Sequence, residues 1–341
     1  MGQVRLLLLP LSLMYGSIMA LRNKFFDWGI FRTYKIPIHS ICVGNLSVGG
    51  TGKTPHVELI ASWLINESKN IAILSRGYGR TTKGLLEIKE VLSAELSGDE
   101  PLQYKTKFKN KAVVVVSEDR RKGVEYIIQH FPQTDVILLD DAFQHRKVKC
   151  GINLIITPYN APYTKDFVIP AGNLREFRSG INRADKIIIS KCPANLSKDQ
   201  RHSLIESLNV DLNKVHFSHV NYESIKSLSN FRFEDFEKVI VVTGIGNPEP
   251  FVKRVAESKE LVHMNFRDHH IFNANDIDQI HQKIDTFANG QCAVITTEKD
   301  YMRIKSKKLN AFAKGSWFYW PIEVDLHEDV KLKQYILDYV G

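Results

Sequence analysis

The sequence predicts an α/β protein in which a parallel sheet with helices on both faces is followed by a second, smaller α/β domain. Three observations support this prediction. Short runs of Val, Ile and Leu recur without polar alternation and are separated by helical patterns, which is typical of a parallel sheet covered on both faces. A glycine-rich loop follows the first run and precedes a helix, and an uncharged apolar segment precedes both.

Length and composition limit the class of protein. At roughly 150 residues per domain, the 341 residues suggest about two domains. With 43% hydrophobic and 25% charged residues, the chain is neither disordered nor collagen-like. The formal net charge of +8 favours a polyanionic partner, which could be a nucleotide, a nucleic acid or an acidic membrane face. The four cysteines are widely separated, so we interpret them as core thiols of a reducing compartment.

The first segment, residues 1–31, is expected to be a membrane-associated helix. Residues 6–21 carry no charge, and a helix of this length would span about 24 Å, short of the roughly 30 Å hydrocarbon core. Aromatic and basic residues follow, which suits the headgroup region. The helix is therefore expected to be a membrane anchor that either forms a short span or lies in the interface. The body of the protein would then be in the cytosol. A cleaved signal peptide and a buried amphipathic helix remain alternatives.

The body divides into two predicted domains, residues 32–192 and residues 193–341. In the first, apolar runs predict strands at residues 41–43, 71–74, 112–116, 136–139, 154–156 and 187–189. Helices are predicted between them at residues 54–66, 101–107 and 121–130. In the second, we expect helices at residues 198–208, 251–257 and 275–287, and strands at residues 239–242, 261–266, 293–296 and 318–320.

The most specific signal is the sequence SVGGTGKT at residues 47–54. It matches the phosphate-binding pattern G-x-x-x-x-G-K-[ST] except that Ser47 replaces the first glycine. The backbone amides of such a loop and the following helix N-terminus form an anion site, here made by Gly49, Gly50, Thr51 and Gly52. Lys53 would reach the β- and γ-phosphates of ATP, and Thr54 would bind Mg²⁺. The first domain is therefore predicted to resemble a P-loop NTPase.

A second signal supplies carboxylates for the metal. Asp140 and Asp141 directly follow the predicted strand at residues 136–139, at the sheet edge where ligands of open α/β folds bind. Either one would hold the Mg²⁺ shell. Because adjacent strand residues point to opposite faces, only one is expected to face the metal directly.

Further charged residues that could take part in the reaction lie in predicted loops. Asp99 precedes a helix, so it is either an N-cap or a carboxylate that accepts a proton from an attacking hydroxyl. Arg175 could neutralise phosphate charge, and Glu176 could complete the Mg²⁺ shell. The Asp268-His269-His270 run lacks the further ligands that a zinc site needs.

Seven motifs occur in order along the chain. They are residues 44–55 (GNLSVGGTGKTP), 75–79 (SRGYG), 98–101 (GDEP), 140–145 (DDAFQH), 172–176 (GNLRE), 268–270 (DHH) and 297–300 (TEKD). Together they resemble a known family, the tetraacyldisaccharide 4′-kinases, which are the lipid A 4′-kinases of Gram-negative bacteria. The similarity extends from the N-terminal segment to about residue 301, and the last forty residues carry no motif that we can match.

The resemblance implies an enzyme on the cytosolic face of the inner membrane. It would transfer the γ-phosphate of ATP to the 4′-hydroxyl of a tetraacylated disaccharide 1-phosphate. The family pattern implies that Asp141 and Glu176 belong to the metal shell, and that Arg175 and Gln144 lie near the γ-phosphate. It also implies that Asp99 is the general base, assisted by His269 rather than by His270.

The alternative function is a P-loop switch or metallochaperone-type NTPase that acts on a partner protein. Some such NTPases carry an additional lysine early in the loop, where this chain has Ser47-Val48. No basic stripe with interleaved aromatic residues or zinc-ligand spacing supports binding to nucleic acid. We also predict no obligate protein partner.

Overall fold

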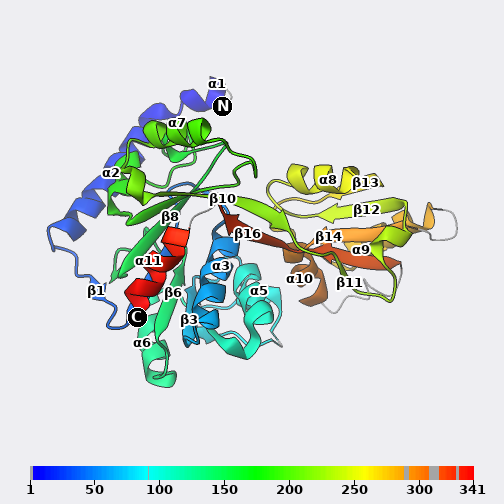
Figure 1. The fold of residues 1–341 in the computed structure, drawn as a ribbon, viewed down its shortest axis with the longest axis horizontal. Helices are drawn as coiled ribbons and strands as arrows, with labels where there is room; N and C mark the ends of the chain where they lie inside the picture. The colour runs from blue at the N-terminus through cyan, green and yellow to red at the C-terminus, as the bar shows by residue number, and fades with distance from the viewer. Residues whose placement is uncertain (1–2, 91, 288–291, 307–314, 328–329) are drawn as a thin grey trace.

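The computed structural model describes residues 3–90, 92–287, 292–306, 315–327 and 330–341. Two sheets organise these residues and lie side by side (Figure 1). The nine-stranded sheet has the order β16-β10-β9-β8-β2-β6-β3-β5-β4, and the five-stranded sheet has the order β11-β15-β14-β12-β13. A short parallel pair, β1 (Tyr34–Lys35) and β7 (Val148–Lys149), stands apart from both.

The nine-stranded sheet is parallel except at its two edges, where β4 pairs antiparallel with β5 and β16 with β10. Most side chains of its central strands are buried on both faces, as the apolar runs predicted. The strands are β2 (His39–Gly44), β3 (Ile71–Ser75), β4 (Leu86–Glu87), β5 (Ala112–Val116), β6 (Val136–Asp140), β8 (Ile152–Pro158), β9 (Lys186–Ser190), β10 (Val215–Tyr222) and β16 (Ile322–Leu326).

Helices cover both faces of this sheet, which confirms the predicted α/β architecture. One core cluster joins it to α3 (Lys53–Asn66), α5 (Asp99–Phe108) and α11 (Val330–Val340). The opposite cluster joins it to α6 (Arg120–His130) and α7 (Lys198–Leu208). Short helices complete this part of the chain: α4 (Ala94–Ser97), η1 (Lys109–Lys111), η2 (Tyr163–Lys165), η3 (Arg178–Arg183) and η4 (Leu212–Lys214).

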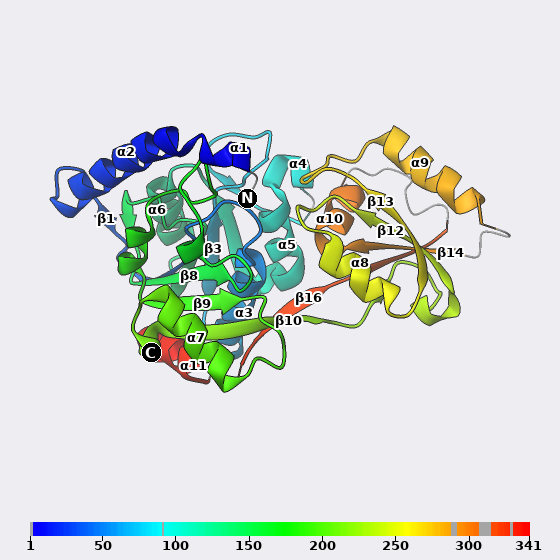
Figure 2. The ribbon, with the colours of Figure 1, turned by 90° about the horizontal axis from the view of Figure 1, so that it is seen from above.

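The five-stranded sheet forms a second unit with its own two core clusters. Its strands are parallel except for the edge strand β11, which pairs antiparallel with β15. The elements are β11 (Lys226–Ser227), η5 (Phe233–Asp235), β12 (Lys238–Thr243), α8 (Glu249–Ala256), β13 (Glu260–Asn265), α9 (Ala274–Asp285), β14 (Cys292–Thr297), α10 (Glu298–Ser306) and β15 (Ser316–Trp320). Helix α10 packs against α4 and α5, on the side facing the first unit (Figure 2).

The sheets divide the chain differently from the predicted boundary at residue 192. After β9, the chain adds α7 and β10 to the first sheet, builds the five-stranded sheet, and returns through β16 and α11. The apolar-run criterion missed both β10 and β16 because their sequences, VHFSHVNY and IEVDL, mix polar with apolar residues. The final residues, which carried no recognisable motif, therefore close the first unit.

The N-terminal segment folds into α1 (Gln3–Leu6) and α2 (Leu9–Asp27), and α2 lies along the outside of the first unit (Figures 1 and 2). Its inner face is closely packed: Ser12 Oγ accepts a hydrogen bond from the Ala171 amide, and a Cβ added at Gly16 would lie 2.5 Å from the Phe177 ring. Among the described residues, no helix is long and apolar enough to cross a membrane, so a spanning N-terminal helix is not supported.

Candidate active site

The phosphate loop follows β2 and ends at α3, as the sequence predicted. Gly49 and Gly52 have φ angles of 100° and 95°, in the region that side chains disfavour, so the loop depends on glycine at these two positions. Two buried side chains hold Thr51 of the loop in place. Asn45 Nδ2 donates to Thr51 Oγ1 over 2.9 Å, and Ser190 Oγ donates to the Thr51 carbonyl over 2.7 Å. The loop is thus shaped before any ligand arrives.

Two supports of the loop gave no signal in the sequence. The first is His56, whose Nδ1 lies 2.7 Å from the Gly52 carbonyl and whose Nε2 lies 2.9 Å from Ser218 Oγ. Burial lowers the pKa of His56 to about 4, against a smaller opposing effect of its bond to Gly52, so the imidazole is neutral. The second is Lys191, whose Nζ donates to the Gly50 carbonyl over 2.6 Å.

The loop at residues 172–176 is joined to the phosphate loop. The Val48 amide donates to the Asn173 carbonyl over 2.7 Å, and the Arg175 amide donates to the Leu46 carbonyl over 2.7 Å. This places Arg175 beside the end of β6, where its Nη1 donates to Asp141 Oδ1 over 2.8 Å. Lys53 Nζ lies 3.8 Å from the same oxygen. The predicted phosphate-binding cations therefore gather around one carboxylate.

The two adjacent aspartates face different surroundings, but not by alternation along a strand as predicted, because β6 ends at Asp140 and Asp141 lies in the following turn. Asp141 has a φ of 50° and is partly exposed, next to Lys53 and Arg175. Asp140 is buried and accepts a hydrogen bond from Ser75 Oγ through Oδ2, while its Oδ1 has no hydrogen-bond partner within the described residues. Burial, helped by the nearby charges of Glu100 and Asp141, raises the pKa of Asp140.

The unpaired Oδ1 of Asp140 is a buried acceptor that could bind a cation. A divalent ion would compensate Oδ1 of Asp140 and lower the pKa of that carboxyl. Within the part of the chain that the structure describes, no three His, Cys, Asp or Glu side chains form a complete metal cage. That agrees with Mg²⁺, which usually binds one or two carboxylates together with phosphate oxygens and water.

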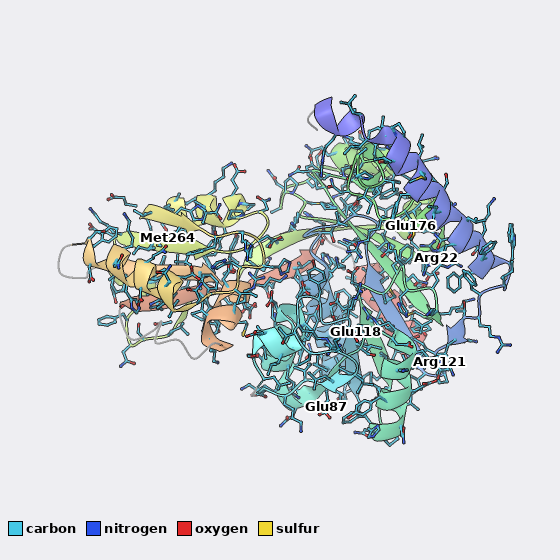
Figure 3. The ribbon with its side chains drawn as sticks, turned by 180° about the vertical axis from the view of Figure 1, so that it is seen from behind. Arg22, Glu87, Glu118, Arg121, Glu176 and Met264 are labelled. Atoms are coloured by element: carbon cyan, nitrogen blue, oxygen red, sulfur yellow. The ribbon has the colours of Figure 1, made fainter. Side chains whose placement is uncertain are left out.

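Glu176 and Gln144 form a network that joins the phosphate loop to α2. Arg183 donates to both oxygens of Glu176, over 2.8 and 2.9 Å, and Asn23 Nδ2 donates to Oε2 over 2.7 Å. Gln144 Nε2 donates to Oε1 of Glu176 over 3.2 Å and to the Asn45 carbonyl over 2.8 Å. Figure 3 shows Glu176 close to Arg22 of α2. The role of Glu176 as a metal ligand stays a prediction, and in this arrangement both its oxygens hold neighbouring segments.

Asp99 is the first residue of α5 and lies beside the loop that follows β3. The N-cap of this helix is Gly98, so the N-cap reading of Asp99 is wrong. Its Oδ2 accepts hydrogen bonds from Arg303, over 2.8 Å from Nε and 2.6 Å from Nη2, and lies 3.2 Å from His269 Nδ1. Burial opposes ionisation, but the bond from His269 and the charge of Arg303 outweigh it and lower the pKa of Asp99 to about 2.

The structure separates the two adjacent histidines. His269, with a φ of 56°, projects from the loop after β13 toward Asp99, and the Tyr78 ring packs edge-on against it. His270 turns the other way, with Nε2 2.8 Å from Asp276 and its ring stacked on Phe266. Only His269 is therefore placed beside the predicted base.

Glu100 lies between the two halves of the site. Lys299 Nζ of α10 donates to Glu100 Oε1 over 2.8 Å, so this ion pair joins the two units. Burial opposes ionisation of Glu100, but Lys299 and, more weakly, Lys53 lower its pKa. The charge of Glu100 in turn contributes to the raised pKa of Asp140. Glu100, the residue after the predicted base, is thus within electrostatic reach of both Lys53 and Asp140.

Comparisons with known proteins point to one family. The family described as LpxK, tetraacyldisaccharide-1-P 4′-kinase, matches residues 4–341. Tetraacyldisaccharide 4′-kinase of Flavobacterium johnsoniae is 38% identical over 347 residues, covering 98% of both chains. That of Cytophaga hutchinsonii is 37% identical over 332 residues, covering 96% of this chain and 93% of the relative.

A solved structure shares the fold over nearly the whole length. It is the crystal structure of LpxK from Aquifex aeolicus in complex with ATP, with a TM-score of 0.76 and 30% sequence identity. The alignment covers 99% of this chain and 100% of that chain. The motif resemblance is confirmed: this chain belongs to the tetraacyldisaccharide 4′-kinase family.

Proposed function

We propose that this chain transfers the γ-phosphate of ATP to the 4′-hydroxyl of a tetraacylated disaccharide 1-phosphate. The observation that carries the proposal is the pairing of Asp99 with His269 next to a fully formed phosphate loop. A switch NTPase needs the phosphate loop, but it does not need a general base that deprotonates an alcohol acceptor. The identity of the acceptor, the 4′-hydroxyl of the lipid disaccharide, is inferred from the family to which the chain belongs.

The phosphate half of the site positions ATP and neutralises its charge, which is the main demand of phosphoryl transfer. The amides of residues 49–54 would bind the phosphates of ATP, and Lys53 and Arg175 would neutralise the γ-phosphate. Thr54, Asp141 and Asp140 would hold Mg²⁺, which would draw charge from the phosphate oxygens. Arg175 and Lys53 contact Asp141 in the described structure, so these contacts loosen as the nucleotide takes the cations.

Asp99 would accept the proton of the 4′-hydroxyl. Three donor atoms approach Oδ2, and no hydrogen bond to Oδ1 is found within the described residues, so Oδ1 is available to the substrate. With a pKa of about 2, Asp99 is ionised throughout the working range but is a weak base. It can serve because the proton leaves late, once the hydroxyl oxygen has begun to bond to phosphorus.

The outer face of α2 would place the enzyme on the membrane that holds its substrate. Large apolar side chains recur there at helical spacing and are exposed, namely Leu11, Met14, Ile18 and Leu21, and Leu7 in the turn before the helix is exposed as well. Such a stripe is typical of a helix that lies in the interface rather than across it. Trp28, Ile30 and Phe31 extend the apolar surface beyond the helix. We therefore propose association with the cytosolic face of the inner membrane.

The test supplies γ-labelled ATP, Mg²⁺ and the monophosphorylated lipid disaccharide in mixed micelles. The expected product carries the label at the 4′ position, and ATP turnover without lipid is slow. Rapid ATP hydrolysis without lipid, and no labelled lipid when it is present, would instead support the partner-protein NTPase.

A further inference from the structure

Arg303 of α10 is a buried cation that crosses from the second unit into the first. Its side chain is 5% exposed, and its Nε and Nη2 donate to Asp99 Oδ2 over 2.8 and 2.6 Å. Nη1 donates to the Gly244 carbonyl over 2.7 Å, and Nη2 lies 3.2 Å from His269 Nδ1. One guanidinium therefore contacts Asp99, His269 and the loop after β12.

The motif TEKD at residues 297–300 anchors this guanidinium. Asp300 is fully buried and accepts from Arg303 Nη1 over 2.8 Å, from the Gly244 amide over 3.0 Å and from Thr297 Oγ1 over 2.8 Å. A buried carboxylate satisfied in this way fixes the direction of the arginine one turn later on α10. Lys299 of the same motif forms the ion pair with Glu100, so the motif contributes two of the contacts between the units.

We propose that Arg303, held by Asp300, is a positioning residue that orients Asp99 for proton transfer. This proposal rests on the function proposed above. Two nitrogen atoms of Arg303 donate to Oδ2 and His269 Nδ1 also contacts it, so Oδ2 is held in place and Oδ1 is left for the acceptor hydroxyl. Since Arg303 belongs to the second unit and Asp99 to the first, the base is oriented only when α10 is docked on α5.

A simple structural bridge is the competing explanation, and the pair Lys299–Glu100 shows what that looks like. It joins the same two helices over 2.8 Å but does not touch Asp99 or His269 in the described structure. A bridge would affect mainly stability, and its removal would lower the rate equally whether or not Asp99 can act as a base. A positioning residue acts through Asp99, so its effect vanishes when Asp99 cannot act.

The experiment compares Arg303→Met and Arg303→Lys with the exposed control Arg232→Met, each in wild-type and Asp99→Asn backgrounds. Lipid-dependent kcat is expected to fall about 100-fold for Arg303→Met and about 10-fold for Arg303→Lys, with the Kd of ATP within about 3-fold of wild type. In the Asp99→Asn background, Arg303→Met is expected to change the residual rate by less than about 3-fold.

The pH profile gives a second readout. The charges around Asp99 are Arg303, Lys299 and Glu100, with His269 as its hydrogen-bond partner. Arg303→Met removes a cation that lowers the pKa of Asp99, so the acid limb of kcat/KM is expected to move to higher pH. Arg303→Lys keeps the charge but not the planar fork, so it should lower kcat with a smaller shift of that limb.

Two results would overturn the proposal. One is a folded Arg303→Met enzyme with wild-type kcat and acid limb. The other is an equal loss of rate with and without Asp99, which would mark Arg303 as a structural bridge. If Arg303→Met does not fold, the Lys variant decides, and wild-type kcat in that variant contradicts the orienting role. A wild-type enzyme that labels no lipid would instead remove the proposed function itself.

Discussion

The two halves of the site are built in different ways. The phosphate half comes from segments that follow neighbouring strands of one sheet, and its loop is held by groups such as Asn45 and Ser190. The base half needs Asp99 from the first unit and His269 and Arg303 from the second. A phosphate site can therefore be completed by local sequence, whereas the base can be presented only by docking of two units.

The halves also use charge differently. The cations of the phosphate half contact Asp141, whose side chain is 30% exposed, and are free to move to an incoming phosphate. In the base half, Arg303 forms a buried ion pair with Asp99. Asp300 forms a second ion pair with Arg303 and compensates a further part of the positive charge of Arg303. The first arrangement suits a ligand that comes and goes, and the second suits a fixed geometry.

The sharpest way to separate the halves is Asp99→Asn. We expect kcat to fall about 10³-fold because the proton acceptor is lost, while the Kd of ATP stays unchanged because the phosphate loop is intact. Isothermal titration with an ATP analogue and lipid-dependent labelling measure the two quantities. Near-wild-type turnover would remove Asp99 from the base role.

Lys53→Ala probes the other half. Both nucleotide affinity and rate are expected to fall, with kcat/KM for ATP lower by about 10²-fold, since the side chain neutralises phosphate charge in the ground state and the transition state. The exposed Lys198→Ala serves as the control. If ATP affinity and rate are unaffected, the cradle is not where the phosphates bind.

His56 tests whether the phosphate loop is rigid because of its buried support. Its pKa of about 4 in the folded state lies below the ordinary 6.5, so the unfolded chain binds more protons between these values. Stability is therefore complete above pH 6.5 and falls as pH drops toward 4, by up to about 3 kcal/mol. Denaturant unfolding from pH 7 to pH 4.5 should show this slope for wild type and for His202→Gln. If the free energy of unfolding of His56→Gln keeps the full dependence on pH, the dependence comes from groups other than His56.

The smallest expected effect concerns the apolar stripe. Leu7→Gln, Met14→Gln and Ile18→Gln together should weaken binding to anionic vesicles and raise the KM for lipid about 10-fold, with kcat near wild type. These variants are preferable to a truncation of residues 1–24, which would also remove Asn23 and its bond to Glu176. Leu212→Gln, an exposed apolar control away from α2, should bind vesicles normally. Unchanged vesicle binding of the triple variant would mean that the stripe does not face the membrane.

The sequence predicted the elements that carry the phosphate half because local pattern determines them. The strand, the glycine-rich turn and the helix start in residues 41–66 are a continuous segment, and Asp140 ends a buried strand, with Asp141 directly after it. The pairing of Asp99 with His269 joins residues 170 positions apart, so only the family resemblance pointed to it. Arg303 gave no signal, because an arginine on an exposed-looking helix has no distinctive pattern.

Two further features depend on tertiary structure that local pattern does not encode. Of six described non-glycine residues with positive φ, three lie at the site: Asp141, Lys191 and His269. Such backbone is maintained by surrounding contacts rather than by residue preference. The position of β10 and β16 in the first sheet likewise follows from pairing between distant segments, which moved the predicted boundary.

The most direct test of the account is a single-turnover reaction of enzyme preloaded with γ-labelled ATP and Mg²⁺, started by adding the lipid disaccharide monophosphate. For wild type, we predict rapid appearance of label at the 4′ oxygen. For Asp99→Asn, we predict that ATP remains bound and unreacted. Loss of bound ATP in the Asp99→Asn enzyme, or transfer at the wild-type rate, would contradict a site divided into a phosphate half and a base half.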